Sequence, residues 1–260
     1  MTVLLMTDLE GISGVDSIDQ MEGEGYVYAC RRLEADINAA VAGCFDGGAT
    51  RVLVLDGHAT GINFDPKNID PRAELPGKAW QDEVKTGKVD LVMEVGIHAM
   101  PGTMNGFLDH TQSSVQWFEY TINGRKCGEV AQCALFAGEY GIPMVMVSGD
   151  VAACEEAREF LGNDIATAVV KRGLGRNKAE CLPNDEAEKL IYEAAKKGMT
   201  LKDKVKPFKM IYPLEVKLVH TRTDYCDATM ERHPEFDRID ARTARFTVDK
   251  IVNYGDIMFW

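Results

Sequence analysis

The chain has 260 residues, 45% of them hydrophobic and 27% charged, which is the ordinary composition of a globular enzyme with one large domain or two modest ones. Its 41 Asp and Glu outnumber its 29 Lys and Arg, so the formal net charge is -12. This balance argues against nucleic acid or an anionic membrane surface as the main partner, and it is compatible with binding divalent cations.

The seven cysteines are scattered along the chain and form no C-x-x-C pair. An odd number of dispersed cysteines is typical of a reduced cytosolic protein, and a chain of this length needs no disulfide to fold. The first apolar stretch meets Asp8 too early for the core of a signal peptide, and no apolar run is long enough to span a membrane. We therefore expect a cytoplasmic protein.

Predicted strands and helices alternate over most of the chain. Short apolar runs predict strands over residues 3–6, 51–55, 89–95, 143–147 and 167–171. Apolar positions at helical spacing predict helices over about 26–45, 129–140, 151–161 and 184–197. Strands joined by helical crossovers form a mainly parallel sheet with helices on both faces, so we expect an α/β fold.

Two other segments have turn and loop signals. Residues 59–76 contain Gly, Asn, Asp and Pro and predict a long loop at the end of a strand, where loops are often functional. An alternating run over residues 115–122 is followed by Asn123-Gly124, which predicts a hairpin.

The pattern changes near residue 201, where charged residues are followed by longer predicted strands over 214–220 and 245–252. We expect residues 1–200 to form an α/β metal-binding catalytic core. We expect residues 201–260 to form an α+β extension, which is a candidate region for oligomerisation.

Two carboxylates follow the first predicted strand, in the segment Asp8-Leu9-Glu10-Gly11. Successive strand side chains alternate between faces, so Asp8 and Glu10 can point the same way. Adjacent carboxylates repel one another unless a cation or a proton lies between them. A metal ion is the simplest resolution, although an acidic pair can also cap a turn.

Histidines follow the next two strands. His58 comes after the second strand, His98 after the third, and His110 lies in the loop beyond. Ligands of an open α/β sheet bind beyond the carboxyl ends of its strands, so these side chains should converge with the two carboxylates. Glu129, which opens a predicted helix, is a further candidate. Imidazole and carboxylate are typical ligands of Zn²⁺ or Mn²⁺, and three acids with two histidines indicate a pair of ions and a bridging carboxylate.

Each of these residues also has a purely structural interpretation. A single histidine is more often hydrogen-bonded in the core or at the surface than bound to a metal. Asp56 could orient an imidazole, although its position favours a turn residue. The basic segment 171–176 could bind a substrate carboxylate, but a solvated loop is the simpler interpretation.

Two other functions fit part of the pattern. Phosphatases of the haloacid-dehalogenase type also place two carboxylates after strand one, and Ser148-Gly149-Asp150 resembles their Mg²⁺-binding turn. However, Glu10 stands where that family uses Asp, and the histidines would have no role. A non-catalytic metal- or peptide-binding protein would need the same ligands but not His110.

The motifs of the chain resemble those of the DppA-type zinc D-aminopeptidases. The similar segments are TDLEGISG (7–14), DGH (56–58), GIHA (96–99), DHT (109–111) and INGRKCGE (122–129). They are colinear over roughly residues 1–200, and together they are specific.

The resemblance implies a two-zinc aminopeptidase that hydrolyses short peptides with an N-terminal D-amino acid. The ligands of two Zn²⁺ ions per subunit would be Asp8, Glu10, His58, His98 and Glu129. Asp8 would bridge the ions, and His110 would match the catalytic histidine that assists the attack of activated water on the peptide carbonyl. The resemblance also implies a ring-stacked homo-oligomer, a decamer, with its sites facing an internal chamber.

Overall fold

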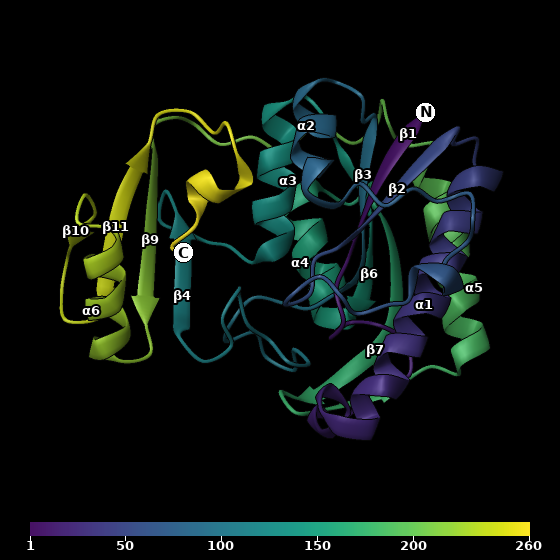
Figure 1. Cartoon of the computed structure of the whole chain (residues 1–260), viewed down its shortest axis with the longest axis horizontal. Coiled ribbons are helices and arrows are strands. Elements are labelled where there is room, and N and C mark those ends of the chain that lie inside the picture. Colours follow the sequence, from purple (N-terminus) through teal and green to yellow (C-terminus); the bar gives the residue numbers. More distant parts are fainter.

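A six-stranded sheet forms the centre of the protein, as seen in a computed structural model that describes all residues, 1–260 (Figure 1). Its strand order is β2-β1-β3-β6-β7-β8, and only β8 runs antiparallel to its neighbour. The strands are β1 (Thr2–Thr7), β2 (Arg51–Asp56), β3 (Leu91–Ile97), β6 (Met144–Asp150), β7 (Ala166–Gly175) and β8 (Lys178–Cys181). The expected α/β fold with a mainly parallel sheet is confirmed.

Helices cover both faces of this sheet. The side chains of each central strand alternate between the two faces, and they are apolar on both. In β1, Val3 and Leu5 pack in the core beneath two of the helices, whereas Leu4 packs in the core on the opposite face. One face is covered by α1 (Gly23–Asp46) and α5 (Asn184–Gly198), and the other by α3 (Glu129–Glu139) and α4 (Val151–Leu161) (Figure 1).

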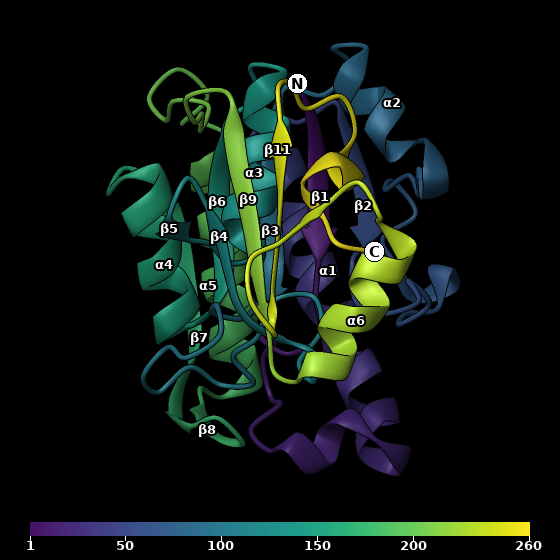
Figure 2. The same ribbon diagram turned by 90° about the vertical axis from the view of Figure 1, so that its left-hand side faces the viewer.

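A second, antiparallel sheet lies beyond α3 (Figure 1) and faces the viewer in Figure 2. Its strand order is β10-β11-β9-β4-β5. Its strands are β4 (Trp117–Ile122), β5 (Arg125–Lys126), β9 (Leu214–His220), β10 (Asp237–Arg238) and β11 (Thr243–Val248). The helix α6 (Thr223–Arg232) packs on β9 and β11. The C-terminal segment, with the short helix η4 (Tyr254–Ile257), returns to pack on α3. The Tyr120 hydroxyl of β4 donates a hydrogen bond to the carbonyl of Ile257 in this segment.

The second sheet takes strands from both sides of the expected boundary at residue 200, because the hairpin β4–β5 pairs with β9. The division into residues 1–200 and 201–260 therefore stays a prediction. One expectation about a single segment was wrong: residues 171–176 lie mostly in the strand β7, not in a solvated loop. The expected loop over 59–76 is present and contains only the short helix η2 (Pro66–Asn68). The helix that follows it, α2 (Trp80–Lys85), was not predicted.

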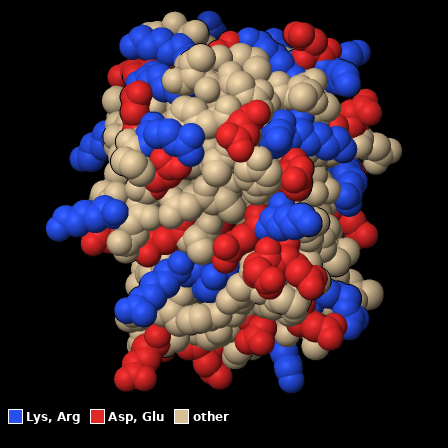
Figure 3. All heavy atoms as spheres, turned by 90° about the vertical axis from the view of Figure 1, so that its right-hand side faces the viewer, with Lys and Arg blue, Asp and Glu red and all other residues tan.

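Acidic and basic side chains are intermingled over the face that carries α1 and α5, and no continuous basic surface covers that face (Figure 3). No helix of the protein is both long enough and apolar enough to cross a membrane. The seven cysteines are all unpaired.

Candidate metal centre

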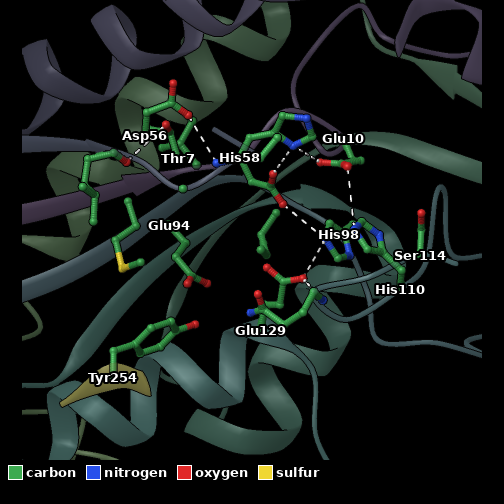
Figure 4. A pocket seen from close by; sticks show the side chains of 18 of the residues that line it. Thr7, Glu10, Asp56, His58, Glu94, His98, His110, Ser114, Glu129 and Tyr254 are labelled. Carbon is green, nitrogen blue, oxygen red and sulfur yellow. Dashed lines mark hydrogen bonds and ion pairs between the residues drawn. The ribbon is translucent and has the colours of Figure 1, made fainter. Parts of the chain in front are cut away.

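The six candidate residues line one cavity of about 670 Å³ at the carboxyl ends of the central strands (Figure 4). Asp8 and Glu10 follow β1, His58 follows β2 and His98 follows β3. The hairpin β4–β5 delivers the fifth, Glu129, as the first residue of α3. Parallel strands β2, β1 and β3 are neighbours, so residues far apart in sequence meet at one edge of the sheet.

A first group consists of Asp8, Glu10 and His58. The Nδ1 atom of His58 lies 2.9 Å from Oδ1 of Asp8 and 3.0 Å from Oε2 of Glu10. One imidazole nitrogen therefore lies between two carboxylates.

A second group consists of Asp8, His98 and Glu129. The Nε2 atom of His98 lies 3.2 Å from Oδ2 of Asp8 and 3.4 Å from Oε1 of Glu129. The other ring nitrogen of His98 lies 3.1 Å from the carbonyl oxygen of Ala99, where it can donate a hydrogen bond. Such a bond leaves the lone pair on Nε2, the nitrogen that faces the carboxylates, and this is the usual arrangement of a metal-binding histidine.

His110 stacks on His98, with ring centroids 3.8 Å apart. Its Nδ1 atom donates to the carbonyl of Leu108 at 2.7 Å, and its Nε2 atom lies 3.8 Å from Oε1 of Glu10. Leu108 has a φ of 51°, a left-handed conformation that is uncommon for leucine and directs this carbonyl toward the ring. The loop thus holds His110 with its free nitrogen toward the cluster.

The charges of the cluster shift its pKa values in the directions that hold these ion pairs together. Burial opposes ionisation of Asp8, but hydrogen bonds from His58 and His98 hold the pKa of its carboxyl well below the usual range. Burial lowers the pKa of His58, but the hydrogen bonds to Asp8 and Glu10 outweigh it and raise that pKa to about 11. These shifts show that the buried carboxylates favour positive charge beside them, which a bound metal cation would supply.

The donor set fits a metal ion. Apart from the contacts with the histidine nitrogens, the buried atoms Oδ2 of Asp8 and Oε2 of Glu10 have no hydrogen-bond partner. Unpaired buried carboxylate oxygens are costly, and a cation would satisfy them. Carboxylate and imidazole ligands suit zinc, and the two groups could each hold an ion because Asp8 belongs to both.

Buried polar side chains form hydrogen bonds that hold the segment carrying Glu10 in place. Lys171, which is 2% exposed, donates from Nζ to the carbonyls of Glu10 at 2.8 Å and of Val15 at 2.6 Å. Asp36 of α1 accepts hydrogen bonds from the backbone N–H and the hydroxyl of Ser13. Lys171 is thus engaged inside the protein and is not available to bind a substrate carboxylate.

Asp56 is a turn residue, as its position in the sequence favoured. Its carboxylate accepts hydrogen bonds from the backbone N–H groups of His58 at 3.2 Å and Asn63 at 2.6 Å, and it orders the loop between them. Asp150 also has a local role, because it accepts from the N–H groups of Ala153 and Phe107, both at 2.8 Å. Asp150 therefore caps α4 and does not form the Mg²⁺-binding turn of a phosphatase.

Among the lining residues, one buried acid was not predicted as part of the site. Glu94 lies in β3 and is 4% exposed. A sequence signal was present, since Glu94 is the single acid in an otherwise apolar strand, Leu91–Ile97.

Comparisons with known proteins identify relatives of this chain. The model of the D-aminopeptidase family matches residues 1–258. The chain is 33% identical to a D-aminopeptidase of Bacillus subtilis (strain 168) over 214 residues, which are 80% of this chain and 77% of that protein. It also resembles the solved structure of a zinc-dependent D-aminopeptidase, DppA from Bacillus subtilis, described as a self-compartmentalizing protease. That similarity has a TM-score of 0.87 and 26% identity, and it covers 96% of this chain and 92% of the other.

Proposed function

The chain belongs to the D-aminopeptidase family and is a zinc-dependent aminopeptidase, and from this premise we propose that it binds two Zn²⁺ ions and hydrolyses short peptides with an N-terminal D-amino acid. The position of Asp8 is the observation that carries the proposal. Its Oδ1 atom faces His58 at 2.9 Å, and its Oδ2 atom faces His98 at 3.2 Å. A carboxylate with its two oxygens directed toward different histidines is suited to bridge two ions.

In this proposal Asp8, Glu10 and His58 hold one ion, and Asp8, His98 and Glu129 hold the other. Bound zinc supplies Lewis acidity, which activates water and stabilises negative charge on a carbonyl oxygen. The protein contributes the buried carboxylates, which bring the histidines to fixed positions and balance the charge of the ions.

His110 is proposed to transfer a proton. Its Nδ1–H is bound to the carbonyl of Leu108, so Nε2 carries the lone pair and can accept a proton inside the cavity. The nitrogen of a cleaved peptide bond must gain a proton to leave as an amine, and His110 can return the proton to it from the same Nε2 atom. The 3.8 Å between this atom and Oε1 of Glu10 places the transfer beside the ligand cluster.

The relative described as self-compartmentalizing supports a further proposal, that this chain assembles into a ring-stacked decamer whose sites face an internal chamber. Two large apolar side chains, Met104 and Ile211, are each 86% exposed in the single chain. An assembly that covers them would remove apolar surface from water.

The proposed function is tested by zinc analysis of the purified protein together with hydrolysis of D-alanyl and L-alanyl dipeptides. We expect about two zinc ions per chain and faster cleavage of the D-peptide. Asp8→Asn should lose both ions because both need Asp8, whereas Asp164→Asn, an exposed change, should keep them. A single zinc ion per chain that Asp8→Asn does not displace would contradict the two-ion site.

A further inference from the structure

From the ligand cluster the cavity extends along the central strands toward their amino ends. There, three side chains from neighbouring strands lie in one row. Met6 of β1 is in register with Leu55 of β2 and with Glu94 of β3. Residues in register on parallel strands point to the same face, and all three line the cavity. Met6 is two positions before Asp8, so this row lies about 7 Å along the strand from the bridging carboxylate.

Glu94 is a buried acidic side chain without a charged partner, and the thiol of Cys133 is the polar group beside it. Its Oε2 atom makes no hydrogen bond, and no lysine, arginine or histidine forms an ion pair with it. Burial raises its pKa to about 8, and the nearby charges of Glu129 and Asp8 act in the same direction. A carboxylate in an apolar strand costs stability, so its position at the wall of a cavity indicates a role toward something that enters the cavity.

The surroundings of Glu94 fit the stem of a long side chain. Trp80 and Tyr254 also line the cavity, with their rings edge to face at 5.6 Å. Figure 4 shows Glu94 and Tyr254 pointing into the same space, on the opposite side of the cavity from His110. Apolar contacts from Met6, Leu55 and Trp80 with one acidic group at the wall are the features of a pocket for an aliphatic chain that ends in a cation.

Building on the proposed function, we propose that Glu94 is a specificity-determining residue that binds the side-chain ammonium or guanidinium group of the N-terminal residue of the substrate. The α-ammonium group is a less suitable partner, because it is attached to the carbon next to the scissile carbonyl and must stay at the ligand cluster. Glu94 lies one row below that cluster, at a depth that a lysine-like side chain can reach. The substrate class is therefore short peptides with a basic first residue.

Matched substrates test this assignment on the zinc-loaded protein. D-Lysyl-alanine and D-norleucyl-alanine differ only in the terminal ammonium group, so the ratio of their kcat/KM values isolates the contribution of the cation. We expect the native protein to prefer the lysyl peptide by at least about tenfold, the usual effect of a hydrogen bond to a charged group. Glu94→Gln should reduce the ratio to near one, mainly through KM, and Glu94→Leu should favour the norleucyl peptide. Glu193→Gln, which removes an exposed acid of α5, should keep the native ratio.

A native ratio near one would overturn the assignment. An equal loss for both peptides in Glu94→Gln would overturn it as well, because it would place Glu94 at the α-ammonium or in the fold. A binding measurement separates this proposal from the proposed function. If no D-peptide is cleaved, the proposed hydrolysis of D-peptides fails, and calorimetry with D-lysine and D-norleucine decides about Glu94. Tighter binding of lysine that Glu94→Gln abolishes would support the pocket, and no preference for lysine would refute it.

Discussion

The orientations of His98 and His110 are each set by a short-range contact with the histidine's own loop. The Nδ1 atom of His98 faces the carbonyl of the next residue, Ala99, and that of His110 binds the carbonyl two residues earlier. Both contacts direct Nε2 into the cavity, although only His98 also has two carboxylates around that atom. Local backbone geometry thus separates a candidate ligand from a candidate proton carrier.

Replacing His110 separates these two roles. His110→Ala should keep the zinc content, because the five candidate ligands remain, and it should lower kcat by about 10²–10⁴-fold through loss of proton transfer. Zinc analysis and steady-state kinetics on a D-alanyl dipeptide check both expectations. His233→Ala, the same change in the C-terminal segment outside the cavity, is the control. Unchanged turnover in His110→Ala would remove this residue from the reaction.

A buried acid of α4 predicts how stability depends on pH. Burial raises the pKa of Glu156 to about 7, while its carboxylate accepts a hydrogen bond from the N–H of Met100 at 2.7 Å. The folded protein therefore favours the protonated form, and the stability that this group contributes is present below the unfolded pKa of 4.5 and is lost as the pH rises toward 7.

Glu156→Gln removes this dependence, since glutamine stays neutral and keeps an oxygen for the N–H of Met100. The stability of the variant relative to the native protein should rise by about 2–3 kcal/mol between pH 5 and pH 8. Urea unfolding at both pH values and one zinc concentration measures the difference. Parallel stability curves for the two proteins would show that Glu156 does not titrate in this range.

Single residues also mark the limit of what the sequence could predict. Four of the five candidate ligands were predictable because each follows a strand whose apolar run is visible in the sequence, and Glu129 because it opens a predicted helix. Lys171 was not, because a lysine beside Arg172 gives no sign that its ammonium group is buried under the carbonyl of Glu10. Glu94 has a local signal in the sequence. However, its position at a cavity wall without a charged partner depends on the packing of three strands and of Tyr254, which the sequence does not reveal.

At the scale of elements, the segment after β1 approaches the end of β3 very closely. The N–H of Gly11 donates to the carbonyl of Gly96 at 2.7 Å. Gly96 has a φ of 82°, and a Cβ atom there would lie 2.3 Å from the carbonyl oxygen of Asp8. Only glycine fits both the conformation and the space, so this contact fixes Asp8 against the strand that leads to His98.

The change Gly96→Ala should therefore disturb both the fold and the metal site. Gly141→Ala is a matched control, since Gly141 has a φ of 76° and no atom within 4 Å of the added Cβ. We expect the control to lose about 1–2 kcal/mol from backbone strain and Gly96→Ala to lose about 1–3 kcal/mol more from the clash. Urea unfolding and the zinc retained after dialysis report the two effects. Equal losses in both variants would mean that the close approach imposes no constraint.

The elements that were predicted and those that were not differ in periodicity. The central strands and the helices α1, α3, α4 and α5 have long apolar patterns, so their sequences predicted them within a few residues. The strand β8 has only four residues and α6 buries only Cys226 and Thr229, so neither has a recognisable apolar face. Their conformation depends on contacts with β7 and with the second sheet, which no local pattern encodes.

At the scale of the whole molecule, the cavity is completed by both ends of the chain. Asp8 comes from the first strand, whereas Tyr254 and Trp260 come from the C-terminal segment that returns from the second sheet. This sheet and the hairpin that carries Glu129 belong to one hydrogen-bonded unit, since β4 pairs with β9. The second sheet therefore contributes to the site in the single chain, whatever part it takes in assembly.

The proposed chamber predicts both a mass and a limit on substrates. A decamer is ten times 28.7 kDa, about 287 kDa, which sedimentation or mass photometry distinguishes clearly from a single chain. If the sites face an enclosed space, a free D-alanyl dipeptide should be cleaved, whereas the same D-alanyl terminus on a folded protein should resist cleavage because it cannot enter. A 28.7 kDa species that cleaves both substrates equally would contradict the chamber while leaving the metal centre intact, because all six residues of that centre come from one chain.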